Sequence, residues 1–227
     1  MSIEANIEKI QKEIEQACER CGREPSEVTL VAVSKFHPWQ AVCRAADAGV
    51  QVFGESRVQE AKLKISQCPP GIRWQLVGHL QSNKCRDAVQ LFEMIQSVDS
   101  ASLAEQLNKA AQRRSVSLPV LLEVNVAGEA SKFGYSPQAL LENLLNLNEL
   151  SHLEIHGLMA IPPWTPQPEK ARRHFQKLAD LKKQCEDILG APLPVLSMGM
   201  SSDFAVAIEE GSTMIRVGTS IFGERKR

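Results

Sequence analysis

The feature that most constrains this chain is a regular alternation of short β-like runs and longer amphipathic runs. Eight runs of β-branched and aliphatic residues predict strands, and the stretches between them predict helices, a pattern typical of repeated βα units. The expected strands are Thr29–Ser34, Gln51–Gly54, Arg73–Val77, Met94–Val98, Pro119–Val126, Leu153–Met159, Pro194–Ser197 and Thr213–Val217. The expected helices are Trp39–Ala48, Val58–Ser66, Lys84–Val89, Ala101–Arg113, Gln138–Asn148, Glu169–Leu189 and Phe204–Glu210.

Eight such units in 227 residues predict one α/β domain over residues 1–227, a single (β/α)8 or TIM barrel. A doubly wound parallel sheet is the alternative, but no G-x-G-x-x-G follows a strand. Ahead of the first unit, Ile3, Ile7, Ile10 and Ile14 recur at helical spacing. Residues 1–22 therefore predict an extra N-terminal helix that covers the barrel.

Composition and charge exclude several classes of function. A formal net charge of −1 gives no reason to expect nucleic acid or a membrane surface as a partner. No run is apolar enough for a secretory signal or a transmembrane span. Six cysteines without an export signal favour reduced thiols and a cytoplasmic protein. Cys18 and Cys21 form a C-x-x-C pair without the further ligands that zinc needs, so no metal is expected.

The first expected strand ends in a single lysine. Lys35 follows the run Thr29–Ser34, and Pro38 comes three residues later, where a strand cannot continue. Ligands of parallel barrels bind at the carboxyl ends of the strands. Lys35 is therefore a candidate ligand-binding residue at the mouth of the barrel.

Two loops rich in small residues follow the last two expected strands. They are Ser197–Asp203, which opens a helix, and Arg216–Gly223. Backbone N–H groups at such helix starts can bind an anion, and the loops after strands seven and eight are the recurrent phosphate site of this barrel. One alternative is that these residues serve only as caps and turns. Two such loops together with Lys35 favour a phosphate site.

Strand alternation places several polar residues inside the barrel. Gln75, Glu123, Asn125 and Arg216 fall on inward-facing positions. A charge in a barrel interior is unfavourable unless it is paired. For Glu123, pairing with Arg216 or other polar residues and a role at the ligand both stay open. Arg216 lies two residues before Gly218 at the mouth, which favours a functional role.

A set of segments in collinear order resembles one family. These segments are Ala32–Lys35, Phe53–Glu55, Val58–Glu60, Gly78–Lys84, Ser131–Gly134, Gly157–Ala160, Leu196–Ser201, Arg216–Thr219 and Phe222–Gly223. In them the chain is similar to the pyridoxal phosphate homeostasis proteins, which have the fold of the alanine racemase N-terminal domain. The matches span residues 32–223, nearly the whole chain.

The resemblance implies a cofactor, pyridoxal 5'-phosphate (PLP), held as a Schiff base on Lys35. It implies an Arg216 near the pyridine nitrogen, where a guanidinium would keep that nitrogen unprotonated. It places Ser201, Gly218 and Thr219 on the phosphate. It places His79 and Met159 around the cofactor cavity. Ser56 stands where the family usually has Asn, so a cofactor contact at that position is not carried over.

The resemblance favours a PLP carrier without catalytic residues over an enzyme. A racemase of this barrel type needs a second acid/base, a Tyr from an additional β domain, whereas the one tyrosine here is Tyr135 and the chain ends soon after the eighth unit. We expect a monomer that acts in PLP homeostasis and affects amino- and keto-acid metabolism, with PLP-dependent apoenzymes as candidate partners. The alternatives are a PLP-dependent amino-acid racemase or decarboxylase, and a lysine-dependent sugar-phosphate aldolase.

Overall fold

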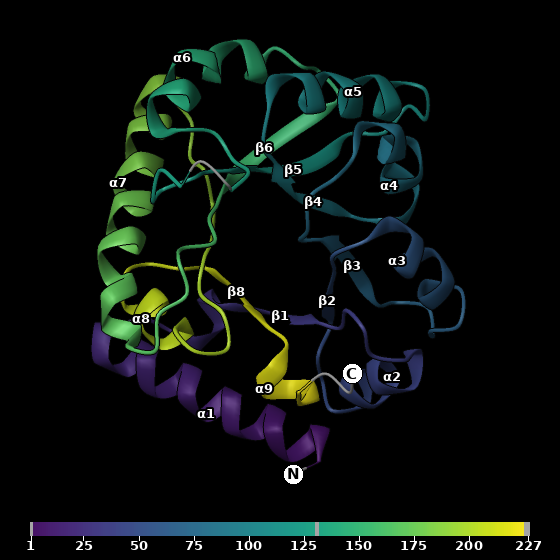
Figure 1. Ribbon diagram of the computed structural model, residues 1–227, viewed down its shortest axis with the longest axis vertical. Coiled ribbons are helices and arrows are strands. Elements are labelled where there is room, and N and C mark those ends of the chain that lie inside the picture. Colours follow the sequence, from purple (N-terminus) through teal and green to yellow (C-terminus); the bar gives the residue numbers. More distant parts are fainter. Residues whose placement is uncertain (1, 130–131, 225–227) are drawn as a thin grey trace.

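The computed structural model, which describes residues 2–129 and 132–224, is a closed barrel of eight parallel strands. The strands follow one another in chain order around the barrel, and β8 closes it against β1, as Figure 1 shows. Their bounds are β1 Thr29–Val33, β2 Val52–Glu55, β3 Arg73–Leu76, β4 Met94–Val98, β5 Leu118–Glu123, β6 Leu153–Met159, β7 Val195–Ser197 and β8 Met214–Val217. The expected (β/α)8 barrel is confirmed.

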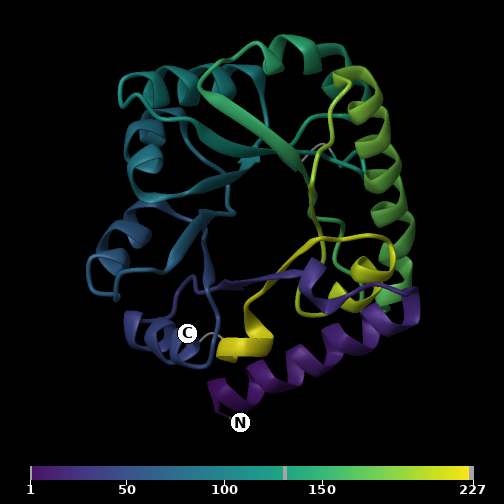
Figure 2. The same cartoon turned by 180° about the vertical axis from the view of Figure 1, so that it is seen from behind.

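The helices form an outer ring around the strands (Figures 1 and 2). Their bounds are α1 Ile3–Cys21, α2 Trp39–Asp47, α3 Val58–Ile65, α4 Cys85–Leu91, α5 Ala101–Gln112, α6 Pro137–Asn148, α7 Arg172–Leu189, α8 Phe204–Glu209 and α9 Thr219–Phe222. The extra helix α1 packs across α8, α9 and α2, which confirms the expected N-terminal covering helix. It buries Ile7, Ile10 and Ile14, and it ends at Gly22 in the left-handed conformation that favours glycine.

Side-chain alternation divides the core into two parts. An inner cluster inside the barrel contains Val31, Val33, Val52, Val77, Met94, Leu121, Met159 and Met214. The residues between them on the strands, such as Ala32 and Leu122, pack outward against the helices. Val31 and Val33 of β1 thus face the barrel interior, on the strand that leads to Lys35.

The fifth strand differs from the sequence-based expectation. It ends at Glu123 rather than Val126. The Val124 N–H still donates to the Met159 carbonyl of β6, but the next N–H, that of Asn125, donates to the Tyr135 carbonyl outside the barrel. The Asn125 side chain was expected inside the barrel. Its amide instead holds its own turn, accepting from the N–H of Gly128 at 3.0 Å and donating to the Glu129 carbonyl at 2.8 Å.

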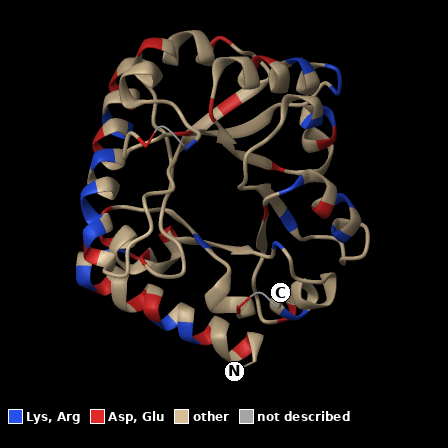
Figure 3. Ribbon diagram, viewed as in Figure 1, with Lys and Arg blue, Asp and Glu red and all other residues tan. Residues whose placement is uncertain are grey.

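Charged residues of both signs are spread over the outer helices (Figure 3). Within residues 2–129 and 132–224, none of the helices combines the length and the apolar character that a membrane span requires. The six cysteines form no disulfide; Cys18 is buried in α1, and the Cys21 thiol donates to the Ala17 carbonyl at 3.2 Å.

Candidate functional site

A cavity of about 510 Å³ opens at the carboxyl ends of the strands. Five of the sequence-predicted site residues line it together: Lys35, Ser201, Arg216, Gly218 and Thr219. The remaining lining residues are Val33, Ser56, Val77, Ile161, Trp164, Met200 and Ser202. The strand order thus brings Lys35 next to loops from the far end of the chain, because β8 is the direct neighbour of β1.

Lys35 lies in the turn that leaves β1, before the chain enters α2 at Trp39. The next residue, Phe36, has φ 67°, which for a side chain larger than glycine costs roughly 1–2 kcal/mol. The turn is stabilised from α3, where a carboxylate oxygen of Glu60 accepts a hydrogen bond from the Phe36 N–H at 2.6 Å. The backbone that follows Lys35 is therefore held by a side chain from another element.

A buried ion pair lies directly behind this turn. The Lys64 ammonium donates to Glu55 at 2.5 Å and to the Ser34 carbonyl at 2.8 Å, while the Ser34 hydroxyl donates to the same Glu55 oxygen at 2.6 Å. Burial raises the pKa of the Glu55 carboxyl, and the hydrogen bonds from Lys64 and Ser34 oppose that shift. Our sequence reasoning missed Lys64, although its spacing of four residues from Glu60 on a helix was a usable signal.

Arg216 forms the charged floor of the cavity. Only 4% of the residue is exposed, and its guanidinium donates to the Ser197 hydroxyl at 2.5 Å and to the Ala160 carbonyl at 2.8 Å. Burial lowers the pKa of Arg216 to about 10, with Glu123 and Asp203 acting in the opposite direction. Arg216 therefore remains a cation at neutral pH.

A chain of hydrogen bonds continues from Arg216 through the barrel interior. The Ser197 hydroxyl donates to Gln96 at 2.7 Å, the Gln96 amide donates to Gln75 at 2.6 Å, and the Gln75 amide donates to Glu93 at 3.2 Å. Every donor points away from Arg216 and toward the Glu93 carboxylate. We call the series Arg216, Ser197, Gln96, Gln75 and Glu93 the interior relay.

Glu123 is the buried acid of the mouth. Burial, with a smaller contribution from the Asp99 carboxylate, raises the pKa of Glu123 to about 7, while Arg216 lowers it. Among the described residues, no ion pair within 4 Å joins Glu123 to Arg216. The direct pairing of Glu123 with Arg216 is thus wrong, whereas a role at the ligand stays a prediction.

The two loops after β7 and β8 meet at the cavity. The Ser201 hydroxyl accepts from the Ser220 N–H at 3.3 Å, which links them. In the first loop the Asp203 carboxylate accepts from the Met200 N–H at 2.7 Å, and Gly199 has φ 91° with Ala207 so close that a Cβ would lie 2.6 Å from its Cβ. This position requires glycine.

Unused donors point to an anion at these loops. Among the described residues, the backbone N–H groups of Ser201, Ser202 and Thr219 donate to no group of the protein. Gly218 lies against β1, so that a Cβ there would be 3.0 Å from the Val33 carbonyl oxygen. The donors and the close backbone approach suit a phosphate.

Two sequence-predicted residues are not brought to this cavity. His79 lines a neighbouring hollow of about 410 Å³, where Nδ1 lies 2.9 Å from Asp99 and the ring stacks on Phe133 at 3.7 Å between centroids. Ser56 lines both hollows. Met159 is fully buried in the inner cluster. Their roles as cofactor contacts stay predictions, and Ser131 of the family-like segments lies outside the described residues.

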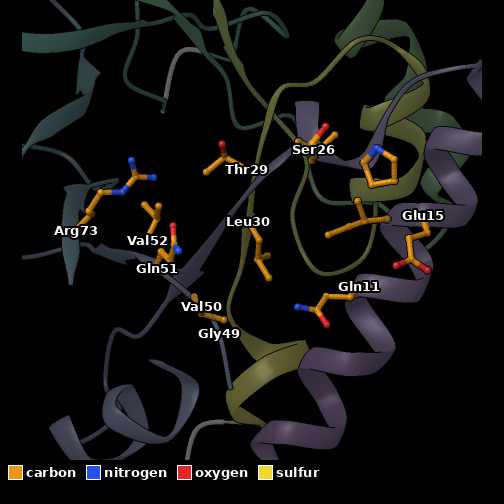
Figure 4. A pocket seen from close by; sticks show the side chains of 13 residues that line it. Gln11, Glu15, Ser26, Thr29, Leu30, Gly49, Val50, Gln51, Val52 and Arg73 are labelled. Atoms are coloured by element: carbon orange, nitrogen blue, oxygen red, sulfur yellow. The ribbon is translucent and has the colours of Figure 1, made fainter. Parts of the chain in front are cut away.

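A second cavity, of about 450 Å³, lies at the opposite end of the barrel, where β1, β2 and β3 begin. Figure 4 shows Gln11 and Glu15 of α1 on one side of it and Arg73 on the other. Its polar side chains are exposed or half-buried, and none is a buried charge.

Comparisons with known proteins agree with this geometry. Residues 5–226 match the family of the alanine racemase N-terminal domain. The chain is 39% identical over 221 residues to the pyridoxal phosphate homeostasis protein of Aquifex aeolicus, covering 97% of both chains. It is also 39% identical over 228 residues to the protein of that name in Escherichia coli (strain K12), covering 97% of this chain and 95% of that one.

Solved structures give the same result. PipY of Synechococcus elongatus PCC7942, solved with PLP bound, superposes with a TM-score of 0.83 at 38% identity, covering 93% of this chain and 100% of PipY. Alanine racemase of Clostridium difficile 630 superposes with a TM-score of 0.72 at 15% identity, covering 98% of this chain but 56% of the racemase. The second likeness shows a shared fold.

Proposed function

Because the chain belongs to the pyridoxal phosphate homeostasis protein family, within the alanine racemase N-terminal domain family, we propose that it binds pyridoxal 5'-phosphate in the Lys35 cavity and acts in intracellular PLP homeostasis. The observation that carries the proposal is the meeting of Lys35, the buried Arg216 and the unused N–H donors of the Ser201 and Thr219 loops in one cavity. Its relative PipY was solved with PLP bound.

Each part of PLP has a matching group in the cavity. The Lys35 amine would condense with the aldehyde and release water to give the Schiff base. Ser201 and Thr219 would donate hydrogen bonds to the phosphate, for which Gly218 leaves room. Arg216, a cation whose burial lowers its pKa only to about 10, would face the pyridine nitrogen and keep it unprotonated. A ring in that state is a weaker electron sink than one paired with a carboxylate, which suits holding the cofactor more than chemistry on it.

The role is that of a carrier rather than an enzyme. Tyr135, the single tyrosine, is buried, with 7% of the residue exposed, and it is not among the residues that line the cavity. Its hydroxyl therefore does not serve as an acid or base there. PLP-dependent apoenzymes are the recipients, and changes in PLP supply affect amino- and keto-acid metabolism. The names of the relatives support homeostasis. Amino-acid racemisation at ordinary enzyme rates of about 1–1,000 per second would overturn the carrier role.

Three further attributes belong to the proposal. The chain forms one domain, because every strand takes part in the same barrel. It works in the cytoplasm, a location supported by six cysteines without a disulfide. It is a monomer, which light scattering of the purified protein checks.

The test is the visible spectrum of the protein with PLP, before and after borohydride. We expect a long-wavelength band that borohydride removes, leaving a reduced adduct that mass mapping places on Lys35. Lys35→Ala should abolish the band while the unfolding temperature stays near that of the parent. Lys62→Ala is the matched control, since Lys62 is an exposed lysine on α3, and it should keep the band. A colourless parent protein with no adduct would exclude the cofactor assignment.

A further inference from the structure

The two peptide bonds that flank Lys35 are both held by side chains of α3. The carbonyl of the peptide before Lys35, that of Ser34, accepts from the Lys64 ammonium at 2.8 Å. The N–H of the peptide after Lys35, that of Phe36, donates to Glu60 at 2.6 Å. Lys64 and Glu60 are themselves joined at 3.2 Å, one helical turn apart. We call this pair the α3 clamp.

The charged groups of Lys64 and its partner Glu55 are buried, which is unfavourable unless polar contacts compensate for it. The Lys64 side chain is 5% exposed and Glu55, its second partner, is fully buried. The other Glu55 oxygen has no hydrogen-bond partner among the described residues. Lys62 on the same helix is by contrast 65% exposed and lies 3.9 Å from Asp87 at the surface. Burying a cation is unfavourable unless several oxygens surround it, and Lys64 has such a set only at the Lys35 turn.

We propose that Lys64 and Glu60 are positioning residues for Lys35, which hold the backbone on both sides of it so that its side chain leaves the turn in the direction of the cavity. The inference rests on the proposed function and deepens it. The clamp contacts the backbone of Ser34 and Phe36, on either side of Lys35, and among the described residues its hydrogen bonds do not reach the loops of Ser201 and Thr219. Its loss therefore affects the bond between Lys35 and the PLP aldehyde, and leaves the phosphate contacts in place.

Two ligands separate these effects. PLP uses both Lys35 and the phosphate loops, whereas pyridoxine 5'-phosphate carries an alcohol in place of the aldehyde and cannot form a Schiff base. A variant that disturbs only Lys35 should bind PLP more weakly and pyridoxine 5'-phosphate as before. A variant that is merely less stable should bind both ligands with the same relative change.

The first experiment compares Glu60→Leu with Glu60→Gln. Glu60 is 24% exposed, so both variants should fold, and the amide oxygen of glutamine can still accept from the Phe36 N–H. By equilibrium titration we expect Glu60→Leu to lose about tenfold in PLP affinity, equal to about 1.4 kcal/mol, and less than about twofold for pyridoxine 5'-phosphate. Glu60→Gln should recover most of the PLP affinity. Equal losses for the two ligands, or no loss in either, would overturn the proposal.

The second experiment compares Lys64→Met with Lys62→Met. Lys64→Met should slow formation of the long-wavelength PLP band and lower the yield of the borohydride adduct on Lys35, and Lys62→Met should match the parent. Because Lys64→Met leaves Glu55 buried without its cation, the double variant Glu55→Gln with Lys64→Met serves if the single variant does not fold. An unchanged rate and yield would contradict the clamp. A parent that binds neither ligand would refute the proposed function instead, and a parent that binds both equally would refute the Schiff base.

Discussion

The two ends of the barrel hold cavities of similar size but different construction. The mouth encloses about 510 Å³ and the opposite end about 450 Å³. At the mouth, Arg216 is 4% exposed, and the loops present N–H groups that the described protein does not use. At the opposite end, Arg73 (Figure 4) has a side chain that is 52% exposed, and it lies 3.7 Å from Glu93. Exposed charges are screened by water, so a charged ligand would gain little free energy by leaving solvent for that end.

The difference shows that volume is a poor guide to a binding site. A buried cation and unpaired backbone donors are unfavourable in an empty protein, and a complementary anion relieves them. Of the two ends, the mouth is the one whose described residues show that combination. Matched substitutions at the two ends should therefore have unequal effects on PLP affinity and on stability.

The largest contrast is expected between the two arginines. Arg216→Met should weaken PLP binding about tenfold to a hundredfold, because hydrogen bonds to a charged group are worth about 1.5–3 kcal/mol. Arg73→Met should change it by less than about twofold, because Arg73 lies at the other end. Equilibrium titration with PLP measures both. Comparable losses in the two variants would remove the distinction between the ends.

The next contrast concerns pH. The pKa of Glu123 in the folded protein is raised from 4.5 to about 7, mainly by burial, so the stability that it supports is fully present below pH 4.5 and is lost as the pH rises through 7. Glu123→Gln cannot ionise, and it should reduce the fall in unfolding free energy between pH 5 and pH 8 by about 1–2 kcal/mol. Urea unfolding at the two pH values gives this difference. An identical pH dependence in Glu123→Gln and the parent would contradict the role of burial.

The smallest contrast is between two glycines. Gly218→Ala brings a Cβ to 3.0 Å from the Val33 carbonyl oxygen, and we expect PLP affinity to fall about threefold to tenfold as the loop shifts. Gly49→Ala, at the opposite cavity, meets no atom within 4 Å but has φ 96°, so it should lower the unfolding free energy by roughly 1–2 kcal/mol without changing affinity. Titration with PLP and thermal unfolding of both variants test whether the first loses affinity and the second loses stability. A Gly49→Ala protein that loses PLP affinity would contradict this contrast.

Sequence patterns predicted the parts of the mouth that depend on chain order. The alternation of strands and helices placed Lys35 after β1 and Arg216 on β8, and barrel closure makes those strands neighbours. The patterns missed the contacts that depend on side chains from different elements meeting in the interior. Lys64 looks like any charged helix residue until the position of the Ser34 carbonyl is known. The early end of β5 was missed for the same reason, since the Asn125 N–H donates to Tyr135, which lies ten residues further along the chain, and not to β6.

The interior relay joins the mouth of the barrel to its opposite end. Each of its members donates to the next, from Arg216 at the mouth to Glu93 near Arg73. Arg216 can only donate and the Glu93 carboxylate can only accept, so the two ends fix the direction of every hydrogen bond between them. The mouth loops are therefore not a portable module. To graft these loops onto another barrel, one would also have to introduce Ser197, Gln96 and Gln75 on the strands. Without them the buried arginine would lack the hydrogen-bond acceptors that it has here.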